Sequence, residues 1–262
     1  MAGATFVVVA ALAIGLLPSR GPGGAPPASA LELAARTAAA QPYRVPGPGE
    51  RWYQRVDGSQ ESEDGHSRQV VDVWVDRDGT AWTRTKFDAP GLHETTPLIR
   101  TTWSELEFVN PMSFKEVQDL PTDPVALRAA LEAVVAKLPK DITYTDPVPM
   151  LALTALGHPG LRPEQRAALF RLLSTSKGVT ATGTGTDQRG RPALTIDALD
   201  KDDPSQPNVM GDEVRTYFAK DTSQLISTEF LATDASIPGV RKGQPFVTML
   251  YDDWKVVPAP KG

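Results

Sequence analysis

The sequence has no cysteine, only three histidines and no large excess of either charge among its 262 residues. The absence of cysteine excludes disulfides, thiolate metal sites, thiol catalysis and a lipid-modified cysteine. The formal net charge of -5 excludes the strongly basic surface that is typical of nucleic-acid-binding proteins. We therefore expect no nucleic-acid partner.

A hydrophobic segment long enough to span a membrane is also missing. The apolar run Phe6–Leu17 has 12 residues, against the roughly 20 that a spanning helix needs. Ala28-Ser29-Ala30 has the pattern of a signal-peptide cleavage site, although no Lys or Arg precedes the run. Residues 1–30 are therefore predicted to be either a cleaved signal peptide or the end of a membrane anchor whose cytoplasmic segment is lost. Both alternatives place the remaining chain outside the cytoplasm.

The residues that follow are rich in proline, glycine and alanine. Residues 31–49 are predicted to be a tether, with a short helix over Leu31–Ala40. Strand and helix patterns begin near Arg51, so residues 50–258 are predicted to form a single extracytoplasmic domain. The contents of 40% hydrophobic and 23% charged residues are ordinary for a folded protein.

Alternating, aromatic and β-branched segments predict strands at both ends of this domain. Arg77-Asp78-Gly79 has the composition of a three-residue hairpin turn with glycine in the left-handed position. The register that follows from this turn has three cross-strand pairs of matching character: Val75 with Ala81, Trp74 with Trp82 and Asp72 with Arg84. Further strands are predicted over 98–109 and 246–257, with hairpin turns at 187–191 and 220–223.

The middle of the domain has helical patterns. Asp123 is placed to cap a helix that begins at Pro124. The apolar positions of this helix share one face: Leu127, Leu131, Val134 and Leu138. An apolar helix is predicted over 147–157, and a third begins at Pro163 and buries Leu169, Leu172 and Leu173. Strands, then about three central helices, then strands predict an α+β fold with a curved, mostly antiparallel sheet over the helices.

The glycine-rich segment around Gly183-Thr184-Gly185 is the candidate for a nucleotide site. A phosphate loop needs a following helix whose amides face the anion, and often a Gly-Lys-Ser/Thr sequence. Here the next segment, residues 193–199, has a strand pattern instead. We interpret the segment as a strand with threonines on one face, whose glycines lie on the bent face that helices approach.

Two serines lie in sequences that are similar to catalytic motifs. Ser174 and Lys177 have the Ser-x-x-Lys spacing, but the companion motifs are missing and the pair lies at a predicted helix end. Ser67 lies in Gly-His-Ser-Arg-Gln, which lacks the second glycine of a nucleophile elbow, and a strand pattern follows it. Neither serine is assigned a catalytic role.

The remaining polar candidates do not have the spacing of a known site. His66, His93 and His158 lack the spacing of a zinc helix, and we expect surface histidines at all three positions. The acidic loop with Asp197, Asp200, Asp202 and Asp203 lacks the glycine and glutamate of a calcium loop. Asp252 and Asp253 point to opposite faces if they lie in a strand. No catalytic, cofactor-binding or metal-binding residue is assigned, no cofactor is expected, and the ligand-binding residues are unknown.

Three stretches together resemble a known family: LPTDPVALRAAL, PEQRAALFRLL followed by KGVTATGTGTDQRGRPALTI, and FAKDTSQLIST. They are similar to an uncharacterised actinobacterial family of membrane-anchored proteins that are often encoded beside extracytoplasmic-function sigma factors. The resemblance covers roughly residues 50–257. It implies a half-barrel fold like that of the LolA/LppX lipoprotein carriers, in which the concave side can hold acyl chains. Ser223 stands where the family commonly has glycine, which implies a strained turn.

The leading hypothesis is a non-catalytic extracytoplasmic envelope protein, either membrane-anchored or secreted. Its partner is an apolar ligand such as a lipid, or a protein of a sigma-factor-linked envelope response, bound in a groove between the sheet and the helices. One alternative is a secreted serine hydrolase that uses Ser67 or Ser174. Another is a purely structural domain of the cell envelope.

Overall fold

The structure, a computed structural model, describes residues 27–62, 65–106, 112–137, 147–199, 213–232 and 240–260. The six helices of this part of the chain are α1 (Pro27–Ala39), α2 (Trp103–Leu106), α3 (Phe114–Gln118), α4 (Pro124–Val135), α5 (Pro147–Leu156) and α6 (Pro163–Thr175). The predicted apolar segment, residues 6–17, lies outside the described residues. No helix in the described ranges combines the length and the apolar character needed to cross a membrane.

The strands form one 11-stranded sheet whose pairs are all antiparallel. Its order is β4-β3-β2-β1-β10-β9-β8-β7-β6, while β11 pairs with β1 and β5 pairs with β3. The first five strands are β1 (Glu50–Ser62), β2 (Gly65–Val75), β3 (Thr80–Ala89), β4 (Leu92–Thr95) and β5 (Ile99–Thr102). The others are β6 (Val179–Thr186), β7 (Pro192–Leu199), β8 (Glu213–Ala219), β9 (Leu225–Leu231), β10 (Pro245–Tyr251) and β11 (Lys255–Pro258). The predicted α+β fold with an antiparallel sheet is confirmed.

The hairpin between β2 and β3 has the predicted register. Trp74 lies opposite Trp82, and the two predicted pairs on either side are also present. Gly79 has a φ of +84°, and a Cβ added there would lie 2.6 Å from the Cβ of Phe114. Glycine is therefore required for both the backbone conformation and the close approach of α3.

The three predicted helices are α4, α5 and α6. The side chain of Asp123 accepts a hydrogen bond from the amide of Ala126, as expected of an N-cap, and Pro124 begins α4. The predicted apolar residues of α4 and α6 are buried: Leu127, Leu131, Val134, Leu169, Leu172 and Leu173. The fourth predicted position on α4, Leu138, lies outside the described residues.

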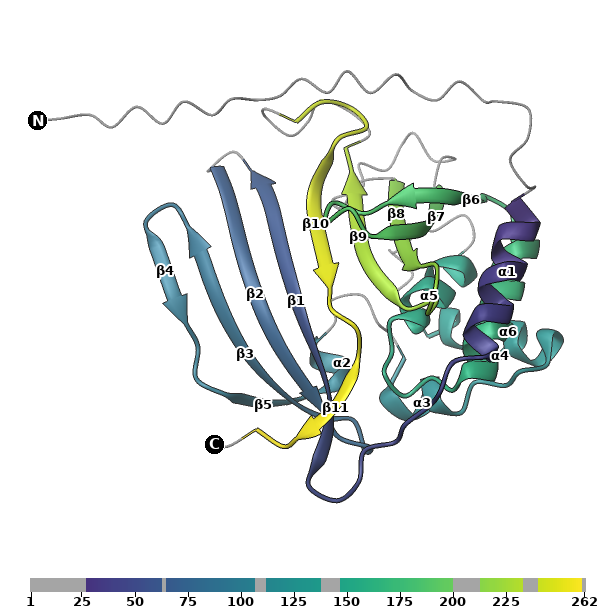
Figure 1. The fold of residues 1–262 in the computed structure, drawn as a ribbon, viewed down its shortest axis with the longest axis horizontal. Helices are drawn as coiled ribbons and strands as arrows, with labels where there is room; N and C mark the ends of the chain where they lie inside the picture. Colours follow the sequence, from purple (N-terminus) through teal and green to yellow (C-terminus); the bar gives the residue numbers. More distant parts are fainter. Residues whose placement is uncertain are drawn as a thin grey trace, which may run out of the picture.

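The helices gather at the β6–β9 end of the sheet and leave most of β1–β4 without a helix over it (Figure 1). Phe170 of α6 meets Phe218 of β8 edge to face, with ring centroids 5.1 Å apart. Ile196 of β7 and Leu169 of α6 are also fully buried in this core. Packed side chains therefore fill the space between the helices and β7–β8.

Helix α1 belongs to this core, so the prediction that its residues are part of a tether is wrong. The helix predicted over Leu31–Ala40 is present as Pro27–Ala39, but Leu31, Ala35 and Ala38 are buried against the other helices. Small alanine side chains let α1 lie close to α6 (Figure 1). The folded unit therefore begins at α1 and not near Arg51, while the role of residues 1–26 stays a prediction.

A second, smaller core lies where α2 and α3 pack against β1, β2 and β3. Its buried residues are Trp52, Val73, Val75, Ala81, Trp103 and Phe114. The amide of Trp103 donates to the carbonyl oxygen of Gly79 over 2.9 Å, and its side chain is buried. The strand predicted over 98–109 therefore ends at Thr102, because burial of Trp103 turns the chain into α2; residues 107–109 lie outside the described ranges.

Strand β6 is the segment that resembled a phosphate loop. The predicted hairpin at 187–191 is confirmed, because β6 pairs with β7 across this turn. The register of this pairing shifts between Thr182 and Gly185. A Cβ on Gly183 would lie 3.7 Å from the Cβ of Ala30 in α1, which confirms that this glycine faces a helix. A Cβ on Gly185 would lie 2.5 Å from Oγ1 of Thr195, so the close neighbour of Gly185 is strand β7 and not a helix.

The turn between β8 and β9 contains the residue for which strain was expected. Ser223 has a φ of +54°, and it is the non-glycine residue with positive φ in the described part of the chain. Its hydroxyl donates to the carbonyl oxygen of Ala34 over 3.0 Å. This hydrogen bond joins the turn to α1 and offsets part of the cost of the left-handed conformation.

Candidate functional site

The two serines considered for catalysis do not lie in catalytic arrangements. Ser67 lies within β2, with no strand-to-helix turn around it. The hydroxyl of Ser174 donates to the carbonyl oxygen of Arg171 at the end of α6, as expected of a helix terminus. Among the described residues, neither serine hydroxyl is hydrogen-bonded to a histidine or a lysine.

The expectation of surface histidines is confirmed at two positions and wrong at the third. His66 and His93 are exposed on β2 and β4, each beside a carboxylate. His158 is fully buried, and its ring centroid lies 4.7 Å from that of Trp103 and 4.3 Å from that of Phe114. Burial in this aromatic setting, and then the charge of Arg166, lower the pKa of His158 to about 3.

The acidic candidates are separated in the structure. Asp197 lies on β7 and forms an ion pair with Arg215 over 2.7 Å. The other three aspartates of that loop lie outside the described residues. Asp252 and Asp253 lie between β10 and β11, so the strand predicted over 246–257 is interrupted there. No group of three or more potential metal ligands occurs within the described ranges.

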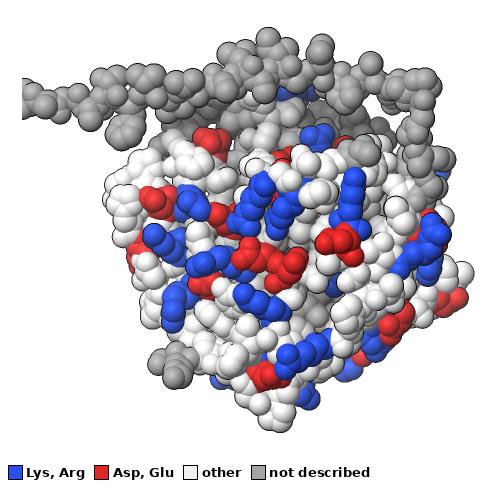
Figure 2. Space-filling model, in the orientation of Figure 1, with Lys and Arg blue, Asp and Glu red and all other residues white. Residues whose placement is uncertain are grey.

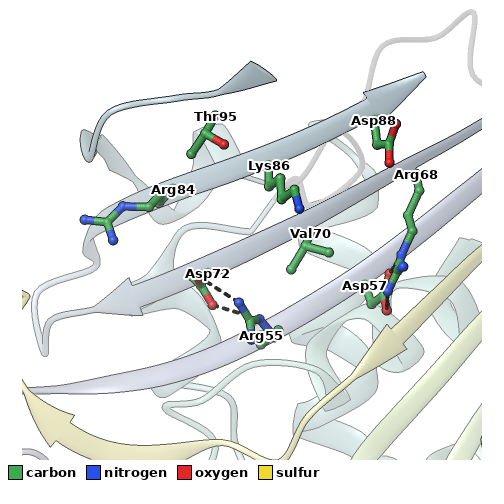
Figure 3. A pocket seen from close by; sticks show the side chains of 9 residues that line it. All are labelled: Arg55, Asp57, Arg68, Val70, Asp72, Arg84, Lys86, Asp88 and Thr95. Atoms are coloured by element: carbon green, nitrogen blue, oxygen red, sulfur yellow. Dashed lines mark hydrogen bonds and ion pairs between the residues drawn. The ribbon is translucent and has the colours of Figure 1, made fainter. Parts of the chain in front are cut away.

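The outer side of β1–β4 is charged, and we call it the charged face. Figure 2 shows basic and acidic side chains intermingled over these strands. They come from alternate positions, because a strand points every second side chain to the same side of the sheet. An open hollow of about 460 Å³ on this face is lined by Arg55, Asp57, Arg68, Val70, Asp72, Arg84, Lys86, Asp88 and Thr95 (Figure 3).

Much of the charge on this face is already paired. The guanidinium of Arg68 donates two hydrogen bonds to Asp57, and this contact lowers the pKa of Asp57. Arg55 pairs with Asp72 across β1 and β2 over 3.1 Å. Arg84 and Lys86 form no ion pair with any residue that the structure describes, and Figure 3 draws them without a dashed line.

A second hollow, of about 300 Å³, lies between the sheet and the helices, and we call it the aromatic cleft. Its lining comes from the end of α1 and the segment after it, the start of β1, the α5–α6 connection with α6, the β8–β9 turn, and the residues around β11. The lining residues are Ala38, Gln41, Pro42, Tyr43, Arg44, Trp52, Pro159, Leu161, Pro163, Arg166, Thr222, Gln224, Trp254, Lys255 and Val256.

Hydrogen bonds to backbone atoms hold the walls of the aromatic cleft in place. The indole Nε1 of Trp254 donates to the carbonyl oxygen of Gly157 over 2.9 Å. The hydroxyl of Tyr43 donates to the carbonyl oxygen of Gly160 over 3.1 Å, and burial raises the pKa of this tyrosine. Because both acceptors lie in the connection between α5 and α6, this connection fixes two aromatic rings at once.

His158 stabilises the same connection from its buried side. Its Nδ1 accepts a hydrogen bond from the amide of Gly160 over 2.9 Å, so the neutral ring carries its proton on Nε2. This Nε2 has no hydrogen-bond partner among the described residues. His158 therefore acts as a wall support, and its side chain is not one of the lining residues of the aromatic cleft.

The cleft also contains a half-buried cation, Arg166 of α6. Its Nη1 donates to the carbonyl oxygen of Leu156 at the end of α5 over 2.6 Å. Burial lowers the pKa of Arg166 to about 10, which still leaves the guanidinium charged at neutral pH. The structure thus combines aromatic walls with a charged group that the sequence did not single out.

Comparisons with known proteins give a likeness of fold only. No protein-family model matches the chain, and no curated protein matches it in sequence. Among solved structures, the chain is similar to the MucA/MucB complex of Pseudomonas aeruginosa at 12% identity and a TM-score of 0.34, over 89% of this chain and 58% of that one. It thus spans less than two thirds of that matched chain.

Two further similar structures match over nearly their whole lengths. LprF from Mycobacterium bovis is 12% identical with a TM-score of 0.34, over 92% of this chain and 97% of that chain. The LolA superfamily protein NE2245 from Nitrosomonas europaea is 8% identical with a TM-score of 0.22, over 90% and 96%. At these TM-scores the likeness says nothing about what this protein binds.

Proposed function

We propose that this protein is a non-catalytic binding protein of the cell envelope and that the aromatic cleft holds the apolar part of a ligand. The observation that carries the proposal is the cleft itself, where five separate segments line one hollow and four of them contribute aromatic or proline side chains. Small-molecule sites are typically concave and mostly apolar, with a few fixed polar groups, and their volumes begin at roughly 300 Å³.

Two rings in this cleft, those of Tyr43 and Trp254, are suited to ligand contact because they are fixed and partly accessible. Tyr43 is 36% exposed although its hydroxyl is hydrogen-bonded. Trp254 is half-buried, and its indole nitrogen is hydrogen-bonded as well. A ligand therefore meets aromatic surface whose orientation is already set, which reduces the entropy lost on binding.

The location outside the cytoplasm is part of the proposal. It is supported by the apolar run Phe6–Leu17 with the small residues after it, which suit a signal peptide or an anchor. The motifs similar to the actinobacterial membrane-anchored family support the same location and a place in a sigma-factor-linked envelope response. Detection of the protein in envelope fractions, with its N-terminus sequenced, tests both the location and the cleavage.

Titration of the full-length protein with decan-1-ol, followed by calorimetry, tests the binding proposal. We expect saturable binding that is weakened about ten-fold or more by Trp254→Ala, since an aromatic contact surface is lost. Trp82→Ala, which removes a tryptophan from the other side of the sheet, is the matched control and should leave the affinity unchanged. Absence of saturable binding to the unaltered protein would contradict the proposal.

The charged face supports a second candidate function, the binding of a protein partner. Arg84 and Lys86 lie side by side with the paired charges and are themselves without an ion pair in the described ranges. Unpaired basic groups within a balanced charged surface suit a polar protein interface with acidic residues opposite. An envelope protein that is retained by the unaltered protein and lost with Lys86→Glu would favour this candidate; equal retention would count against it.

A further inference from the structure

We propose that Arg166 makes the aromatic cleft a site for an amphiphile with an oxyanion head group, a carboxylate or a phosphate ester on a single alkyl chain. This inference rests on the proposed binding function and adds the chemistry of the head group. The aromatic side chains contact the alkyl chain, and the guanidinium of Arg166, which lines the same hollow, donates hydrogen bonds to the oxyanion.

The guanidinium of Arg166 retains unused donors. One of its N–H groups is bound to the carbonyl oxygen of Leu156. Its Nε and Nη2 make no hydrogen bond to the described residues, and Arg166 is one of the residues that line the cleft. Two nitrogens on one edge of a planar guanidinium match the two oxygens of a carboxylate or phosphate.

The charges around the cleft favour an anion, although the whole chain carries a net charge of -5. The lining contains three cationic residues, Arg44, Arg166 and Lys255, and no aspartate or glutamate. Arg44 is paired with Glu50, while Lys255 lies over the ring of Tyr53 at 5.0 Å. No described carboxylate lies within ion-pair distance of Arg166. The lining residues themselves therefore carry only positive charge, which favours an anionic head group over a cationic one.

Arg166 also has a structural role, because it binds the carbonyl oxygen at the end of α5. A cation at a helix C-terminus is stabilised by the helix dipole. That role requires one N–H group and leaves the other donors of a residue that lines the aromatic cleft unused. A helix-capping role and an anion-binding role therefore make different predictions about ligands, and the head group of the ligand distinguishes them.

The test compares ligands that share a decyl chain and differ in their head groups, using the full-length protein and calorimetry at pH 7. The probes are decanoate, decyl phosphate, decan-1-ol and decyltrimethylammonium, each below its micelle concentration. We expect the two anions to bind about ten-fold or more tightly than the alcohol, and the ammonium compound to bind more weakly than the alcohol. The ratio between decanoate and decyl phosphate identifies which oxyanion the site prefers.

Variants locate the preference at Arg166. We expect Arg166→Met to weaken the binding of decanoate about ten-fold and to leave decan-1-ol nearly unchanged, while Arg166→Lys keeps part of the preference. Lys86→Met, on the charged face, is the control and should change neither affinity. If Arg166→Met does not fold, the head-group series is measured on the unaltered protein and on Arg166→Lys. These two measurements still decide whether the cleft prefers anions and whether Arg166 causes that preference.

Three outcomes would overturn the inference in distinguishable ways. Equal affinities for decanoate and decan-1-ol would remove the anion site and leave the apolar cleft standing. A folded Arg166→Met that keeps the full preference for anions would place the oxyanion elsewhere. Failure of every decyl compound to bind would contradict the proposed function and this inference together.

Discussion

Buried His158 predicts a specific dependence of stability on pH. In the unfolded chain its pKa is that of an ordinary histidine, 6.5, whereas burial lowers it to about 3 in the folded protein. Between these two values the unfolded state binds a proton that the folded state excludes. The free energy of unfolding therefore decreases as the pH falls through this window, and the contribution of neutral His158 is fully present only above about pH 6.5.

The size of this effect follows from the two pKa values. One pKa unit corresponds to about 1.4 kcal/mol, and the slope develops gradually around pH 6.5. Between pH 7 and pH 5, His158 alone is expected to lower the free energy of unfolding by about 2 kcal/mol. The pKa of Glu116 is lowered to about 2 by Lys137 and the backbone of Ser113. The contribution of Glu116 to the free energy of unfolding is therefore lost only as the pH falls below 4.5, its pKa in the unfolded chain, and it changes little between pH 7 and pH 5.

Urea unfolding at pH 5, 6 and 7, followed by tryptophan fluorescence, measures this contribution when the unaltered protein is compared with His158→Gln. Glutamine offers an acceptor for the amide of Gly160 but does not titrate. The difference in free energy between the two proteins should change by about 2 kcal/mol from pH 7 to pH 5. A difference that is constant with pH would refute the reasoning, because it would mean that His158 is protonated equally in both states.

Substitutions at turns and close contacts give three further predictions, each measured as a change in the free energy of unfolding. Gly79→Ala should cost about 2 kcal/mol or more, since it adds a Cβ at positive φ within 2.6 Å of another Cβ. Gly185→Ala should cost about 1–3 kcal/mol because of a 2.5 Å contact, while Gly183→Ala should cost less than about 0.5 kcal/mol; equal costs would contradict the assigned neighbours. Ser223→Gly should be more stable than Ser223→Ala by about 1 kcal/mol, since both lose the hydroxyl but only glycine relieves the left-handed strain; the opposite order would refute this.

Local chemistry in the sequence predicted the hairpins and the helix ends. Gly79 is in the left-handed conformation that its turn requires, and the facing pair Trp74 and Trp82 follows from the length of that turn. The Asp123 cap is likewise a contact between near neighbours in sequence. Such features depend on residues a few positions apart, so the sequence pattern contains the information that determines them.

Features that depend on remote partners could not be predicted in the same way. The composition after residue 30 suggested a tether, but α1 is held by its packing against α6, much later in the chain. The alternating pattern over 246–257 suggested one continuous strand. In the structure, the amide and the indole nitrogen of Trp254 instead donate hydrogen bonds to Gln224 and Gly157, between β10 and β11. Nothing near His158 in sequence indicates burial, which Trp103 and Phe114 impose.

The aromatic cleft could not be predicted for the same reason. Its residues come from segments that were predicted separately as a tether, a first strand, a helix beginning at Pro163, a hairpin turn and a last strand. Tyr43 and Arg166, for example, meet only in the folded chain. Pro42 beside Tyr43, and the prolines at 159 and 163, are a local signal, but proline is equally frequent in ordinary connections.

The most direct test of the proposed binding site uses the indole N–H resonances of the five tryptophans in a titration with decanoate. Trp52 and Trp254 line the aromatic cleft, whereas Trp74 and Trp82 face each other across β2 and β3 outside it. We predict saturable shifts of the Trp52 and Trp254 resonances, with those of Trp74 and Trp82 unchanged. Shifts confined to Trp74 and Trp82, or no shift at any tryptophan, would contradict the aromatic cleft as the ligand site.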